Sequence, residues 1–140
     1  MKFDSLTIGQ TFKSGFYKVT KEEIITFASQ YDPQYMHIDA NKAEQGIFKG
    51  IIASGLLTLS LSFKLWVELE VLGDDVVAGT GINNLEFSKP VYPEDVLCVT
   101  ATIIDKKERK RSGEVTILLS TKNGGDVQVL KAEMTALVSK

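Results

Sequence analysis

The residues best suited to chemistry are Asp32 and His37, the only histidine of the chain, which stand five positions apart. A carboxylate and an imidazole at this spacing, in the loop after a helix, can converge on one small molecule. One of them can take a proton from water while the other donates one, and an imidazole suits both jobs. The plainer alternative is a lone histidine beside a helix-ending aspartate, and the spacing by itself favours that alternative.

A second candidate is Gly55, within the segment Ala53–Leu57 that opens a long apolar stretch. A helix N-terminus carries free N–H donors and a partial positive charge, and a glycine there places no side chain in the way. Such a donor can stabilise a carbonyl that becomes enolate-like. The alternative is a glycine that is needed for tight helix packing.

The elements that must position these residues begin with a helix. Thr20 and Glu23 form a capping box, in which Thr20 accepts from the Glu23 amide and Glu23 reaches back. Apolar residues at helical spacing follow, and Pro33 ends the helix at Asp32. Asp39 then caps a short helical turn through Glu44.

A second helix is predicted from about Ala53 to Leu72, and it is apolar nearly all round, so we expect other structure to wrap it. The rest of the chain reads as strands separated by turn signals, such as Asn123–Asp126. Strands are predicted at 12–19, 76–87, 96–104, 115–120 and 130–138. Antiparallel strands wrapped around one long helix make an α+β layer architecture.

Composition narrows the class of protein. The chain of 140 residues suits one domain, residues 1–140, and its net charge of −2 argues against nucleic acid as a partner. The single cysteine, Cys98, excludes an intrachain disulfide, and one histidine excludes a His-rich metal site. The start has no signal peptide, and the most apolar stretch is too short to span a membrane. We therefore expect a soluble, cytoplasmic protein.

Several motifs together resemble a known family. The segment around Asp32, His37 and Asp39 is similar to the hydratase motif Asp-x-Asn-Pro-x-His-x-Asp. Gly50–Leu56 is similar to the family's segment that enters the central helix, and Phe87–Asp95 to its "F-x-K-P-V…G-D" strand and turn. The combination resembles the MaoC-like dehydratases, or (R)-specific enoyl-CoA hydratases, over roughly residues 5 to 138.

The resemblance implies a hot-dog fold that pairs into homodimers or higher homo-oligomers. It implies a hydro-lyase that adds water to a trans-2-enoyl thioester or removes it from an (R)-3-hydroxyacyl thioester. Asp32 and His37 would activate the water, and the Gly55 amide would polarise the thioester carbonyl. No metal and no redox cofactor are implied. Coenzyme A, or an acyl-carrier protein, would carry the acyl chain as part of the substrate.

The chain also departs from the family pattern. Gln34 and Tyr35 replace the usual Asn-Pro, and Phe63 replaces a serine that often lies eight residues after the helix glycine. Ser60 shares a helix face with Phe63, so we expect Ser60 to supply any supporting hydrogen bond to the carboxylate and Phe63 to narrow the acyl pocket. Gln34 is a further candidate near the catalytic pair.

Two other functions stay open at this point. A hot-dog thioesterase commonly places a carboxylate on or facing the central helix, whereas the predicted helix has no acid before Glu68. The altered loop after Asp32 also leaves room for a non-catalytic acyl-binding subunit. The basic run Lys106–Arg111 is either a solvated hairpin tip or a contact for the phosphates of coenzyme A.

Overall fold

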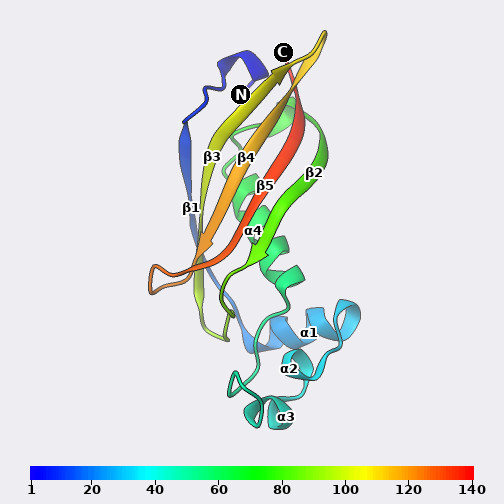
Figure 1. The fold of residues 1–140 in the computed structure, drawn as a ribbon, viewed down its shortest axis with the longest axis vertical. Coiled ribbons are helices and arrows are strands. Elements are labelled where there is room, and N and C mark those ends of the chain that lie inside the picture. Colours follow the sequence, from blue (N-terminus) through cyan, green and yellow to red (C-terminus); the bar gives the residue numbers. More distant parts are fainter.

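The computed structural model describes residues 1–140, which form five strands, four α-helices and two short 3₁₀-helices. Figure 1 shows one long curved sheet with the longest helix against it and three short helices gathered at one end. The strands are β1 (Thr11–Lys18), β2 (Val76–Phe87), β3 (Val96–Glu108), β4 (Ser112–Lys122) and β5 (Gln128–Ser139). The helices are η1 (Phe3–Ser5), α1 (Lys21–Tyr31), α2 (Tyr35–Ile38), α3 (Ala40–Glu44), α4 (Gly55–Glu68) and η2 (Gly73–Asp75).

The sheet is antiparallel throughout, with the strand order β1-β3-β4-β5-β2. Buried residues alternate with half-buried ones along most of β3 and β4, so one face of the sheet packs on the core. Leu61 and Leu65 of α4 belong to the same buried cluster as Leu97, Ile117 and Leu130 of the strands. The predicted α+β class is confirmed, and a long helix wrapped by a curved sheet is the hot-dog arrangement.

The central helix is shorter than the predicted span of Ala53 to Leu72. It begins at Gly55, after an N-cap at Ser54, and its last residue is Glu68. Glu70 has a φ of +53°, a left-handed conformation that cannot continue an α-helix. The apolar pattern runs on through Val71 and Leu72 because both are buried after the helix ends. No helix of the structure combines the length and the apolar character needed to cross a membrane.

One side of α4 is left uncovered by its own chain. Leu56, Phe63 and Val67 share a helix face, and their exposed fractions are 48%, 44% and 52%. The neighbouring strand β2 is the last strand of the sheet, and nearly all of its residues are exposed. The expectation that other structure wraps this helix on all sides therefore fails for this stripe in a single chain.

The end of the molecule that holds α1, α2 and α3 differs from the sequence prediction in two details. Thr20 caps α1 by accepting from the Glu23 amide at 3.1 Å, but the Glu23 carboxylate accepts from the Tyr17 hydroxyl instead of reaching back. Helix α1 ends before Asp32, as predicted, and Asp39 caps α3. The segment between them is not a plain loop, because α2 forms one helical turn there.

A buried pair of hydroxyls joins α4 to the middle of the sheet. Ser62 Oγ lies 2.6 Å from Thr121 Oγ1 on β4, and both residues are fully buried. Ser62 also donates to the Thr58 carbonyl at 2.7 Å. Its single proton is then used, so the Thr121 hydroxyl donates to Ser62. This contact ties the middle of α4 to the middle of the sheet.

Removing one member of this pair tests that contribution. Ser62→Ala leaves the Thr121 hydroxyl without its partner, so it should lower the free energy of unfolding by about 1–3 kcal/mol. Thr121→Val should cost less, because Ser62 keeps its bond to Thr58. The double variant should be less destabilised than the sum of the two. Denaturant unfolding measures all three, and additive effects would mean that the two hydroxyls do not interact.

Candidate active site

Asp32 occupies the position directly after α1, where its carboxylate receives two hydrogen bonds. Ser54 Oγ donates to Asp32 Oδ2 at 2.7 Å, and Gln34 Nε2 donates to Asp32 Oδ1 at 2.7 Å. The Ser54 hydrogen bond, followed by that from Gln34 and the nearby imidazole of His37, holds the pKa of Asp32 below its usual value, although desolvation opposes this. The carboxylate is therefore ionised at neutral pH.

His37 lies on α2 and is buried. Its Nδ1 is 2.7 Å from the carbonyl oxygen of Ile52, which can only accept a hydrogen bond. In the neutral imidazole, Nδ1 therefore carries the proton and the lone pair is on Nε2. Nε2 lies 3.4 Å from Asp32 Oδ2, so the structure brings together the two residues that the sequence analysis singled out.

An ionised carboxylate and an imidazole lone pair that face each other are two hydrogen-bond acceptors. They form no direct bond in this state, but one water molecule can donate a hydrogen bond to each of them. A water held in this way is oriented and made more nucleophilic, which is the basis of general base catalysis. The geometry therefore suits activation of a single water.

The segment before α4 runs beside both α2 and the loop after β2, which explains why distant residues meet here. The Ile52 amide donates to the Met36 carbonyl at 3.0 Å, and the Ala53 amide donates to the Val91 carbonyl at 2.8 Å. These two bonds fix the path of the chain just before Ser54, the N-cap of α4. Ser54 then lies against Asp32, twenty-two residues earlier in the sequence.

Gly55 and His37 line the same cavity, which has a volume of about 320 Å³. Gly55 is the first residue of α4, so its amide has no partner within the helix. A Cβ at this position would lie 2.7 Å from the ring of Phe87, at the end of β2. The glycine therefore serves close packing, as one of the two sequence interpretations held, and the residue also lines the cavity.

Of the other predicted residues, only Gln34 reaches the catalytic pair. Gln34 contacts Asp32 directly, as described above. The Ser60 hydroxyl donates to the Leu56 carbonyl at 2.9 Å, and the structure does not bring it to Asp32. Phe63 lines a second, largely apolar cavity of about 700 Å³ between α4, β2 and β5.

Ser54 is the site residue that sequence reasoning passed over. Its oxygen accepts from the Leu56 amide at 3.2 Å, so the same hydroxyl caps α4 and donates to Asp32. A serine directly before a helix glycine is an ordinary N-cap signal, and that signal was available in the sequence. Its contact with Asp32 was not, because it depends on the loop between residues 45 and 54.

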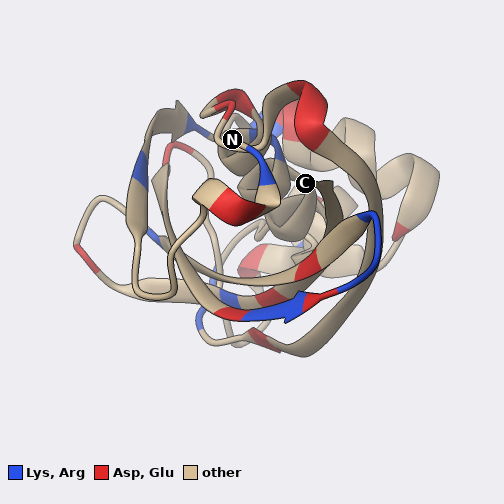
Figure 2. Cartoon of the chain, turned by 90° about the horizontal axis from the view of Figure 1, so that it is seen from above, with Lys and Arg blue, Asp and Glu red and all other residues tan.

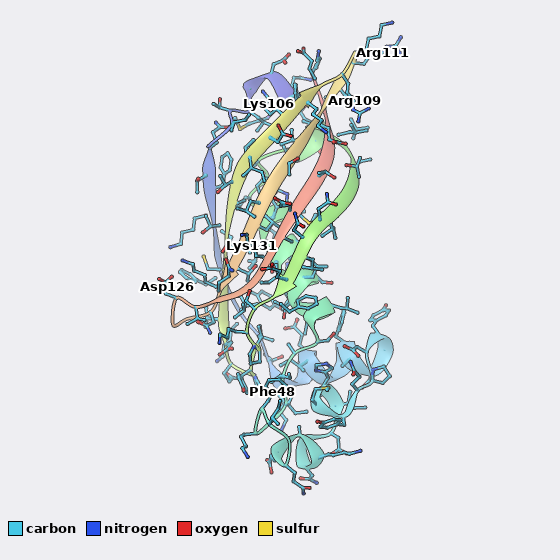
Figure 3. The ribbon with its side chains drawn as sticks, viewed as in Figure 1. Phe48, Lys106, Arg109, Arg111, Asp126 and Lys131 are labelled. Carbon is cyan, nitrogen blue, oxygen red and sulfur yellow. The ribbon has the colours of Figure 1, made fainter.

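The basic run at the β3–β4 hairpin lies far from this site within one chain. In Figure 3, Arg109 and Arg111 are at the opposite end of the sheet from Phe48, which lines the cavity with His37. Figure 2 shows basic and acidic segments distributed around the chain. The structure also contains no cluster of three or more His, Cys, Asp or Glu side chains that could hold a metal ion.

Comparisons with known proteins agree with this fold. The chain is 49% identical to the uncharacterised protein YdeM of Bacillus subtilis over the full length of both chains. It is 29% identical to the 3-hydroxyacyl-thioester dehydratase Z of Mycobacterium tuberculosis, over 78% of this chain and 73% of that protein. The crystal structure of a MaoC-like dehydratase from Rhodospirillum rubrum superposes with a TM-score of 0.92 at 28% identity, covering 100% of this chain and 97% of that one.

A family model described as the MaoC-like domain matches residues 4–124, which is most of the chain. That range includes α1, α2, the whole of α4 and four of the five strands. It therefore contains Asp32, His37 and Gly55 within one matched domain. The chain belongs to the MaoC-like domain family, as the motif around Asp32 and His37 indicated.

Proposed function

We propose that this protein is a hydro-lyase that adds water to a trans-2-enoyl thioester, or removes it from the (R)-3-hydroxyacyl thioester. The observation that carries the proposal is the Asp32 carboxylate 3.4 Å from Nε2 of His37, which lines a cavity together with Gly55 at the start of α4. Membership of the MaoC-like family and the dehydratase name of one relative support the same reaction class.

In the proposed reaction, one water lies beside Asp32 Oδ2 and His37 Nε2 and contacts both of them. Its oxygen attacks the β-carbon of the enoyl group as one of the two acceptors takes a proton from it. The electrons of the double bond move onto the thioester, whose carbonyl oxygen becomes enolate-like and accepts a hydrogen bond from the Gly55 amide. The catalytic pair then returns one proton to the α-carbon, so the enzyme ends in its starting protonation state.

The acyl carrier is coenzyme A or an acyl-carrier protein, and the acyl chain extends into the apolar space along α4. Phe63 lines this space together with Trp66 and Ile82, so its ring limits the width available to the chain. No further cofactor is needed for the proposed reaction, because water addition involves no change of redox state.

One assay separates the candidate functions. With crotonyl-CoA as substrate, the proposed hydratase removes the enoyl absorbance without releasing a thiol. A thioesterase would release the thiol, and a non-catalytic acyl-binding subunit would do neither. Thiol release without loss of the double bond would overturn the proposal.

We also propose that the protein is a homodimer formed through β2. This strand is at the edge of the sheet, and its only charged residue is Glu86. Natural edge strands that stay unpaired usually carry lysines, prolines or several charges, so β2 is suited to pairing with another strand. The exposed face of α4 and the 700 Å³ cavity lie beside it, and a second copy related by two-fold symmetry would cover all three.

The catalytic pair is tested by Asp32→Asn and His37→Ala. Each substitution should lower kcat by about 10²- to 10⁴-fold, because each removes one of the two groups that handle the proton. The double variant should lose less than the product of the single effects, since both groups act on one water. Asp126→Asn, in the exposed β4–β5 turn, is a matched control. Near-wild-type activity in either single variant would contradict the mechanism.

Gly55→Ala tests the start of α4. The new Cβ would meet the Phe87 ring at 2.7 Å, so the ring must move across the cavity wall and displace the thioester from the Gly55 amide. We expect turnover to fall at least about 10-fold while the helix remains folded. Adding Phe87→Leu removes the ring that the Cβ pushes into the cavity, so it should recover both thermal stability and turnover, because the Gly55 amide is unchanged. If Gly55→Ala lowers thermal stability while its folded fraction keeps the wild-type turnover, Gly55 serves packing alone.

The assembly is tested by light scattering. The wild-type protein should have about twice the 15.4 kDa mass of one chain. Ile82→Lys places a charge on the half-exposed apolar face of β2, so it should shift the protein toward monomer. Val127→Lys changes an equally exposed apolar residue in the β4–β5 hairpin and should leave the mass unchanged. A monomeric wild-type protein would refute the proposal.

A further inference from the structure

Ser54 is fully buried and makes two hydrogen bonds through one oxygen atom. Its hydroxyl proton is donated to Asp32 Oδ2 at 2.7 Å, and its lone pair accepts the Leu56 amide at 3.2 Å. Helix capping needs only the acceptor half of this group. The donor half is aimed at the carboxylate, and capping does not account for it.

We propose that Ser54 is the positioning residue of the catalytic carboxylate. It fixes Asp32 in the ionised form and leaves the remaining lone pair of Oδ2 for the water shared with His37. This inference rests on the proposed function and adds to it a residue to which neither the family motif nor the sequence analysis gave a role. Ser54 does not touch substrate in this arrangement and acts only through Asp32.

Ser54 can position the water because Oδ2 has only two lone pairs that accept hydrogen bonds. This oxygen is the one nearest His37 Nε2, at 3.4 Å, so it must bind the water. With the Ser54 proton on one side of the oxygen, the water is confined to the other side, toward the imidazole. Gln34 holds Oδ1 in the same way, so both ends of the carboxylate are fixed and its plane cannot rotate.

The same serine also ties the two halves of the site together. Ser54 precedes Gly55 directly, so a single residue sets the distance between the carboxylate and the amide proposed to bind the thioester oxygen. A shift of the α4 N-terminus would move both groups together. The water and the thioester carbonyl are therefore positioned relative to each other by one short segment, rather than by two independent ones.

The charged and titratable groups around Asp32 are few, which makes a pH measurement interpretable. His37 faces it from α2, and Lys89, after β2, lines the same cavity as His37. The start of α4 contributes only the neutral Ser54. Loss of the Ser54 hydrogen bond should raise the pKa of Asp32, because that bond is the main cause that keeps it low. The fall of kcat at acid pH, the acid limb of its pH profile, should then move to higher pH.

The test compares two substitutions of Ser54. Both remove the hydroxyl, but they differ in how well the new residue caps the helix. Glycine is nearly as good an N-cap as serine, whereas alanine is a poor one. If Ser54 positions Asp32, Ser54→Gly and Ser54→Ala should both lower kcat for crotonyl-CoA by about 10- to 100-fold, the loss expected for one hydrogen bond to a charged group. Both should also move the acid limb of kcat upward, although only Ser54→Ala should lose much thermal stability.

Thr20→Ala is the matched control. It removes the side-chain cap of α1, whose oxygen accepts from the Glu23 amide, without touching Asp32. It should lower thermal stability and leave the acid limb where it is in the wild-type protein. If Ser54→Gly keeps the wild-type kcat and acid limb while only Ser54→Ala loses activity, Ser54 is a helix cap and the proposal fails.

A second readout does not depend on activity. The carboxyl carbon of Asp32 can be followed by NMR as the pH is lowered, in the wild-type protein and in Ser54→Gly. A higher pKa of Asp32 in the variant supports the inference, and an unchanged one overturns it. If the wild-type protein does not hydrate crotonyl-CoA, the proposed function fails, but this titration still decides the role of Ser54.

Discussion

The hydrogen bond from Ser54 to Asp32 is the interaction on which the rest of the site depends. It joins the end of α1 to the start of α4, two helices that are separated in sequence by the whole segment 33–53. That segment contributes α2 and His37, which in turn bonds to the carbonyl of Ile52. Each member of the site is therefore held by another member or by the backbone beside it, and little is left to side-chain freedom.

The backbone supplies much of this organisation. The amides of Ile52 and Ala53 donate to the carbonyls of Met36 and Val91, and the Ile52 carbonyl bonds to the His37 ring. This segment cannot slide by one residue without breaking all three contacts. The helix that follows begins at Gly55, which lines the cavity, and the sheet packed against that helix limits its rotation.

The fold that holds the site also leaves an apolar face of α4 exposed in a single chain. Five strands cover one side of α4, and the strip of Leu56, Phe63 and Val67 stays exposed next to the edge strand β2. None of the five strands covers that strip. The proposed homodimer would cover it, and the apolar cavity along α4 lies at the proposed interface.

The sequence by itself determined the element types and the catalytic candidates. Helix α1, its Thr20 cap, β2 and the Asn123 turn follow from local signals, because caps, alternation and turn residues act within a few positions of the chain. The tertiary structure decided what those signals cannot encode. The end of α4 at Glu68 depends on Glu70 adopting a left-handed conformation, although its apolar pattern continues to Leu72. The partner of Asp32 proved to be Ser54 rather than Ser60, because the hydrogen bond forms across a loop whose path is set by backbone contacts between distant segments.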